Sequence, residues 1–267
     1  MINDPVLAVA VRAARRAGSV IVDAARDLKR LPAHAKEHGD IATAADNEAE
    51  NAIVATIRAA FPEHAILGEE SGHIEGARER AGFKWIVAPL DGAANFAHGY
   101  PYFAVSVALA HGTEITHAVV FDPVRDELYA AIRGKGAQLN GAAIRTSSCM
   151  TLEQALVSTV FPQRQSPQMA AYVPLFNAFV AKCPGVRRTD AAALDLAYVA
   201  VGRLDGFWVT SLKPWDVAAG ALLIKEAGGR VGDFAGGVDF LRASEVIAAA
   251  PGVFNALRES LAAARRQ

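Results

Sequence analysis

Cysteine, long apolar runs and charge of one sign are all scarce in this sequence. Cys149 and Cys183 are the only cysteines, and they lie far apart without C-x-x-C spacing. We therefore expect two reduced thiols, which excludes a disulfide framework and a cysteine-based zinc site. No apolar run reaches the about 20 residues that a membrane-spanning helix needs, so we expect no membrane partner.

The balance of charges also limits the partners. The 27 Lys and Arg residues nearly balance the 28 Asp and Glu residues, and the two signs are interspersed. Such a surface has no electrostatic footprint for nucleic acid, so we expect none as a partner. Asp4 and Arg12 stand within an amphipathic pattern near the N-terminus, which is unlike a signal peptide. The expected location is the cytoplasm.

Hydrophobic residues make up 52% of the 267 positions, enough for one large domain or two tightly packed halves. Helical spacing predicts a helix over Pro5–Leu28 and another that is capped by Asp46 or Asn47 and ends near Phe61. Three β-rich runs that predict an antiparallel meander follow: Phe103–Ala110, Ile115–Phe121 and Glu127–Ile132. From about Thr151, strand and helix patterns alternate. We therefore predict an α+β unit over residues 1–150 and an α/β unit over residues 151–267.

The stretch from Trp85 to Phe96 combines a buried strand, a turn and a helix start. Its apolar beginning predicts the strand, and Pro89 should end that strand because it lacks an N–H group. Asp91 and Gly92 then form a turn, and a helical turn can begin at Ala93. A carboxylate at a strand end, followed by free backbone N–H groups, can hold a divalent cation beside a phosphate.

This stretch resembles the signature W-I-x-D-P-[IL]-D-G-T-x-N-F of the inositol monophosphatase family. Further segments agree with that family in the same order along the chain: Asp40–Asp46 with Glu50, Gly68–Ser71, and Pro214–Gly220 leading into Glu226–Gly229. The segments Gly136–Gly141 and Ala193–Tyr198 are most similar to the bacterial branch. The resemblance implies a layered α-β-α-β-α sandwich with a metal site between its halves, and a homodimer.

The resemblance also implies a magnesium-dependent phosphomonoesterase that hydrolyses a small polyol or sugar phosphate with a metal-activated water. The metal ligands would be Glu69, Asp91, Asp216 and the Leu90 carbonyl. Catalytic roles would fall to Glu69, Asp91, Asp46 and Thr43. Phosphate or substrate would contact Gly92, Ala93, Ala94, Asp190, Ala191, Ala192 and Asp216. Structural caps at a helix start are the competing roles for Asp46 and Asp216.

The sequence departs from the family pattern around this one pocket. Ala88 stands where the pattern has its first aspartate, and Ala93 stands where it has threonine. Asp190 replaces a glycine, Val209 replaces a glutamate that binds a substrate hydroxyl in relatives, and Ser211 replaces a glycine. We therefore expect weak magnesium binding and impaired hydrolysis.

Three explanations remain open for these departures. The chain is an enzyme with reduced activity, or it is a binding or scaffold protein on the same fold, or Ala88 and Ala93 were introduced on purpose to trap a ligand. Within the enzyme hypothesis, the alternative substrates are other sugar phosphates, histidinol phosphate and nucleotide 3′-phosphates.

Overall fold

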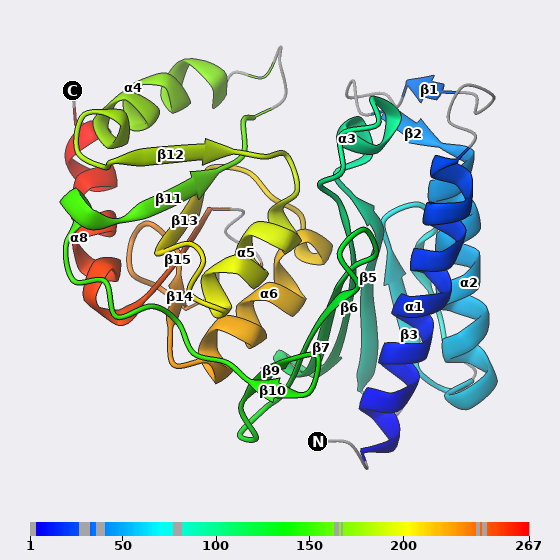
Figure 1. The fold of residues 1–267 in the computed structure, drawn as a ribbon. Coiled ribbons are helices and arrows are strands. Elements are labelled where there is room, and N and C mark those ends of the chain that lie inside the picture. Colours follow the sequence, from blue (N-terminus) through cyan, green and yellow to red (C-terminus); the bar gives the residue numbers. More distant parts are fainter. Residues whose placement is uncertain are drawn as a thin grey trace.

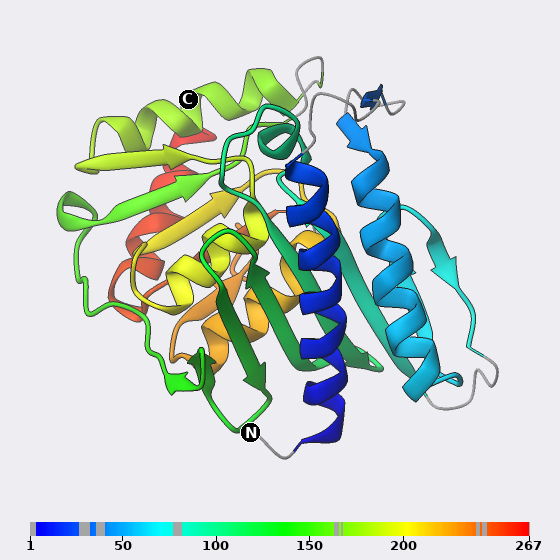
Figure 2. The same ribbon diagram turned by 45° about the vertical axis from the view of Figure 1, so that its right-hand side comes forward.

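Helices and sheets alternate in layers in the computed structural model, as predicted (Figure 1). The structure describes residues 4–26, 33–35, 41–76, 82–162, 166, 168–238, 241 and 245–266, with only the backbone for 33–35 and 41–43. Helices α1 (Pro5–Ala25) and α2 (Ala44–Ala60) run side by side over one face of the first sheet (Figure 2). Helices α5 (Ala192–Ala200) and α6 (Pro214–Glu226) lie between the two sheets. The order α-β-α-β-α is completed by α4 (Gln168–Val180) and α8 (Pro251–Ala264) on the outer face.

Helix α1 begins and packs as its sequence dictates. The Asp4 carboxylate accepts the N–H groups of Val6 and Leu7 at 3.1 and 3.0 Å, which caps the helix. Gly18 lies on the buried face, where an added Cβ would stand 2.5 Å from the ring of Phe121. Glycine at this position therefore lets α1 approach the first sheet closely. Residues 27 and 28, which the sequence also assigned to this helix, lie outside the described residues.

The first sheet has eight strands in the order β10-β9-β8-β7-β6-β5-β3-β4. Its strands are β3 (Ala65–Gly68), β4 (Gly72–Ile74), β5 (Phe83–Asp91), β6 (Ala104–His111), β7 (Glu114–Asp122), β8 (Glu127–Ile132), β9 (Ala137–Leu139) and β10 (Ala142–Ala143). The predicted meander is confirmed, because β6, β7 and β8 pair antiparallel in sequence order. The short strands β4, β9 and β10 were not predicted. A separate antiparallel pair joins β1 (Ala33–Ala35) to β2 (Ile41–Thr43).

Strand β5 continues past Pro89, so the prediction that proline ends it is wrong. The pairing with β6 shifts register between Ala88 and Asp91. Proline is tolerated at such an irregularity because no ladder hydrogen bond is required of its nitrogen. The consequence is that Asp91 is the last residue of a buried strand and not part of an open loop.

The second sheet has the order β12-β11-β13-β15-β14, in which β12, β11 and β13 are parallel. Its strands are β11 (Leu156–Thr159), β12 (Gly185–Arg188), β13 (Gly206–Val209), β14 (Arg230–Gly232) and β15 (Val246–Ala249). In parallel sheets, ligands bind beyond the carboxyl ends of the strands. The arrowheads of β11 and β12 in Figure 1 face the side of the molecule that carries the short helix α3 (Ala93–Ala97).

One cluster of buried apolar side chains joins the two sheets through α5 and α6. It includes Ile86 of β5, Leu196 of α5, Leu222 of α6 and Val246 of β15. A core shared in this way fixes the positions of the helix starts relative to β5. The division of the chain near residue 150 into two units stays a prediction. Within the part of the chain that the structure describes, no helix is both long and apolar enough to span a bilayer.

His64 is a buried histidine in the core beneath α2. Its ring stacks between Phe61 and Phe83, with 4.8 Å between ring centroids on each side. The indole nitrogen of Trp85 donates to its Nδ1 at 3.1 Å, so that nitrogen carries no proton. Burial lowers the pKa of His64, and the nearby Glu63 carboxylate only partly opposes this effect. The fold therefore requires neutral His64.

This requirement predicts a loss of stability on mild acidification. Unfolded histidine binds a proton near pH 6.5, whereas folded His64 does so only at lower pH, so the free energy of unfolding should fall as pH drops below about 6.5. Urea unfolding of His64→Gln between pH 7.5 and 5.5 should show a shallower dependence than the native chain. The exposed His73→Gln is the control and should keep the native slope. Equal slopes in His64→Gln and native protein would contradict the assignment.

Candidate metal and phosphate site

Asp91 is the centre of the candidate site, at the point where the end of β5 meets the start of α5. Its carboxylate is buried and accepts the backbone N–H of Ala192 at 3.1 Å and of Ala193 at 2.8 Å. The charge therefore sits on the N-terminus of α5, where the helix dipole favours it. This contact brings the segment that contains Asp190, Ala191 and Ala192 beside the end of β5.

Asp216 lies in the first turn of α6, and its negative charge makes it harder for Asp91 to ionise. Its side chain accepts the N–H of Lys213 at 2.9 Å, which is the capping role weighed as its alternative. Burial raises the pKa of Asp91 well above the usual value, and the negative charge of Asp216 raises it further. The N–H groups of α5 oppose this shift only in part. A bound cation would relieve the repulsion between the buried Asp91 carboxylate and the half-buried Asp216 carboxylate.

The turn that carries Glu69 is held by a buried residue, Glu50, for which we predicted no role. Glu50 of α2 accepts the N–H of Glu70 at 2.9 Å and of Ser71 at 2.7 Å. An added Cβ at Gly68 would stand 2.6 Å from a Glu50 carboxylate oxygen, so glycine is required for this approach. Glu50 therefore fixes the backbone on both sides of the Glu69 side chain, and its position inside the motif was the only sequence signal for it.

Asp46, Thr43 and Leu90 were also predicted to belong to the site. Asp46 is buried in the first turn of α2, which begins at Ala44, so the prediction that Asp46 or Asn47 caps this helix is wrong. The helix starts earlier because Ala44 and Ala45 favour helix. The side chain of Thr43 lies outside the described part of the chain. Leu90 is buried in β5.

Gly92 starts α3 with a left-handed backbone, at φ +97°. An added Cβ there would stand 3.0 Å from the Tyr102 carbonyl oxygen. Glycine is therefore favoured both by the left-handed backbone and by the lack of space for a side chain. Helix α3 then begins at Ala93, as predicted. The binding of phosphate by the backbone of Gly92, Ala93 and Ala94 stays a prediction.

Ala88 and Val209 leave apolar surface where the family pattern has carboxylates. Ala88 is fully buried in β5 opposite Ser106, and Val209 is 1% exposed at the end of β13. Among the described residues, no group of three or more His, Cys, Asp or Glu side chains is arranged to hold a metal ion. Magnesium often binds through one or two carboxylates, with waters and phosphate oxygens as its other ligands. The side chains of Asp91 and Asp216 fit one such cation, but they do not fit a cluster.

Asp190 has a charged partner that the sequence analysis missed. Its carboxylate lies 2.6 Å from the Arg188 guanidinium, which also stacks over the ring of Phe161 at 4.4 Å from the centroid. The backbone of Asp190 is left-handed, at φ +57°, a conformation that Asp tolerates better than most residues. The negative charge that Asp190 adds beside the predicted phosphate contacts is therefore paired with Arg188. Strand periodicity could not indicate this pair, because β12 ends at Arg188 and the left-handed Asp190 lies beyond it.

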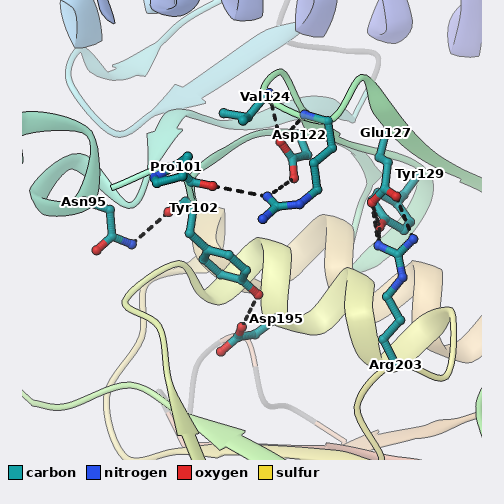
Figure 3. A network of polar contacts seen from close by, with 10 residues as sticks. Asn95, Pro101, Tyr102, Asp122, Val124, Glu127, Tyr129, Asp195 and Arg203 are labelled. Carbon is teal, nitrogen blue, oxygen red and sulfur yellow. Dashed lines mark hydrogen bonds and ion pairs between the residues drawn. The ribbon is translucent and has the colours of Figure 1, made fainter. Parts of the chain in front are cut away.

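A network of polar contacts beside Asp91 was not predicted (Figure 3). The Asn95 side-chain amide donates to the carbonyl oxygens of Tyr102 at 2.8 Å and Thr189 at 2.6 Å. The Tyr102 hydroxyl donates to the Asp195 carboxylate at 2.7 Å, and Asp195 is completely buried in the first turn of α5. Burial raises the pKa of Asp195 to about 7, and the hydrogen bond from Tyr102 acts against this shift. A lone Asp in an otherwise apolar helix was the sequence signal for this network.

Comparisons with known proteins agree with the fold and the motifs. A model of the Inositol monophosphatase family matches residues 2–267. Nus factor SuhB from Pseudomonas aeruginosa is 48% identical over 255 residues, which cover 95% of this chain and 94% of the relative. Nus factor SuhB from Escherichia coli is 43% identical over 253 residues, which cover 95% of this chain and 94% of the relative.

Two solved structures show the same similarity in three dimensions. The extragenic suppressor protein suhB from Bartonella henselae has a TM-score of 0.93 and 40% identity, covering 97% of this chain and 98% of its own. An inositol monophosphatase from Anabaena (Nostoc) has a TM-score of 0.85 and 33% identity, covering 97% of this chain and 95% of its own. With the layered fold and the ordered motifs, these matches show that the chain belongs to the inositol monophosphatase family.

Proposed function

We propose that this chain is a magnesium-dependent phosphomonoesterase of low activity that acts on a small polyol or sugar phosphate. The observation that carries the proposal is the pair Asp91 and Asp216, with Asp91 seated on the N-terminus of α5. This arrangement concentrates negative charge beside backbone N–H groups, which suits a cation and a phosphate together. Family membership supports a phosphatase-type site, whereas the substrate and the metal are our own proposals.

Each residue has a definite task in this proposal. Asp91 and Asp216 hold the cation, with further oxygens from the Leu90 carbonyl and Glu69. Bound magnesium would neutralise charge on the phosphoryl oxygens of the substrate. The backbone from Gly92 to Ala94 and the segment Asp190–Ala192 bind the ester, although the N–H of Ala192 already donates to Asp91.

Low activity follows from the group that would orient the attacking water. Asp46 matches the family aspartate that orients a threonine hydroxyl, and Thr43 matches a neighbouring hydroxyl of the same motif, but Ala93 stands where that threonine would be. A lost donor of this kind commonly lowers the rate by about 10²–10³. Asp46 and Thr43 can therefore take part in orienting the water only if a hydroxyl is restored at position 93.

Isothermal titration with magnesium tests this function before any substrate is identified. We expect weak binding to a single site in the native chain and no measurable binding in Asp91→Asn. Phosphate release from inositol 1-phosphate, followed in parallel, should be slow and should require magnesium. Rapid turnover by the native chain would contradict the impaired site, and hydrolysis that persists in EDTA would contradict the magnesium-dependent enzyme.

A binding or scaffold protein on the same fold is the second candidate. It is favoured by Ala88 and Ala93, and by relatives that are named Nus factors and not phosphatases. A folded native chain that binds no magnesium and releases no phosphate would support it. A homodimer, a cytoplasmic location and the absence of a nucleic-acid partner are further proposals. Light scattering on the purified chain tests the first of them.

A further inference from the structure

The start of α5 is tied to the first half of the chain at three places. Asp91 accepts the N–H groups of Ala192 and Ala193. On one side of this contact, Asn95 bridges the carbonyl oxygens of Tyr102 and Thr189. On the other side, the Tyr102 hydroxyl donates to Asp195, one turn further along α5.

These contacts close a ring, because Asp91 and Asn95 lie on the same short stretch and Tyr102 follows after the turn. The segment before Tyr102 is itself anchored, since Arg125 donates to the Pro101 carbonyl oxygen at 3.2 Å and to Asp122 at 2.9 Å. Figure 3 shows the Tyr102 side chain reaching from this segment to Asp195 on α5. The position of the α5 start relative to Asp91 is therefore fixed from both sides.

We propose that Asn95 and the Tyr102–Asp195 hydrogen bond are positioning elements, which hold the N-terminus of α5 against Asp91 and thereby set the affinity of the site for a cation. The part about the cation rests on the proposed function. The part about position does not, because it concerns only hydrogen bonds between groups of the protein. Asn95 holds the carbonyl groups of Tyr102 and Thr189 together, and the Tyr102 hydroxyl holds Asp195 of α5.

Two tyrosines at this interface offer a matched pair of variants. Both Tyr102 and Tyr129 are buried, and the Tyr129 hydroxyl donates to the Glu127 carboxylate at 2.6 Å. Its other partner is Arg203, which follows the end of α5 and not its start (Figure 3). Tyr102→Phe and Tyr129→Phe therefore each remove one buried hydroxyl at the same interface, but only the first one releases the α5 start.

The experiment compares local opening, global stability and cation binding in these two variants. Native-state hydrogen exchange at the Ala192 and Ala193 amides should become about fivefold faster in Tyr102→Phe, because one buried hydrogen bond contributes roughly 1 kcal/mol. Exchange at these amides should be unchanged in Tyr129→Phe, although both variants should lose similar global stability in urea. The affinity for magnesium should fall several-fold in Tyr102→Phe alone. Asp195→Asn keeps an oxygen that can accept from Tyr102, so its Ala192 and Ala193 exchange should stay near the native rate.

The outcomes separate the two parts of the inference. Unchanged exchange at Ala192 and Ala193 in Tyr102→Phe, or equal acceleration in Tyr129→Phe, would overturn the positioning role. If the native chain binds no magnesium, the proposed function fails, while the exchange measurement still decides the positioning role. Asn95→Ala provides a second route, and it should accelerate exchange at the same two amides.

Discussion

Replacing Ala88 by Asp together with Ala93 by Thr is expected to raise the rate of inositol 1-phosphate hydrolysis by at least about 100-fold, since one missing hydroxyl alone commonly costs about 10²–10³. Ala93→Thr adds a hydroxyl at the first residue of α3, within the stretch that carries Asp91. Ala88→Asp adds a negative charge to β5 three residues before Asp91. The two substitutions thus restore both an orienting group and a cation ligand. Steady-state phosphate release at saturating magnesium measures the gain.

The control replaces Ala88 by Asn in the presence of Ala93→Thr. Asparagine has nearly the shape of aspartate but no charge, so it should recover only the gain that comes from threonine. Because Ala88 is fully buried, an unpaired aspartate there should destabilise the metal-free protein by several kcal/mol. Added magnesium should reverse this loss and raise the melting temperature of the restored variant more than that of the native chain. A restored variant that stays inert would locate the defect at Asp190 and Val209 instead.

Asp91 should have two separable roles, and two substitutions distinguish them. Asp91→Ala leaves the buried N–H groups of Ala192 and Ala193 without their acceptor, which should lower the free energy of unfolding by about 2–5 kcal/mol. Asp91→Asn keeps one acceptor oxygen and also removes the repulsion from Asp216, so it should destabilise less. Both variants should lose at least about 100-fold in magnesium affinity, because a nearby charge contributes roughly 4 kcal/mol even at an effective dielectric of 20. Urea unfolding and calorimetric titration measure the two effects.

A surface aspartate is the control for these substitutions. Asp126 pairs with Arg15, but its side chain is 74% exposed. Asp126→Asn should therefore change neither stability nor magnesium affinity appreciably. If Asp91→Asn binds magnesium as well as Asp126→Asn does, Asp91 is a structural cap of α5 and not a cation ligand.

The parts of the fold that depend on local pattern could be predicted from the sequence. Helical spacing correctly predicted a helix that starts at Pro5, and β-rich runs between turns predicted the meander of β6, β7 and β8. The end of β5 could not be predicted in this way. Whether Pro89 breaks a strand depends on how β5 pairs with β6, and the residues around Pro89 do not reveal that pairing.

In the site too, the features that depend on local pattern were predicted, and those that depend on contacts between distant segments were missed. Asp91 and Asp216 could be predicted as site residues, because each lies in a short motif that is recognised from neighbouring residues in the sequence. The hydrogen bond between Asp91 and Ala192 joins residues that are 101 positions apart. Asn95 and Tyr102 likewise contact Thr189 and Asp195, which lie 94 and 93 positions away. Only packing of α5 between the two sheets brings these groups together. Sequence pattern therefore indicated the chemistry but not the positioning elements.

The number of cations beside Asp91 tests the central claim most directly. Crystals grown with manganese in place of magnesium would reveal each bound ion by its anomalous scattering. We predict one ion in contact with Asp91 and Asp216, because a buried methyl group at Ala88 supplies no oxygen for a second. Two fully occupied ions in contact with Asp91 in the native chain would contradict this account.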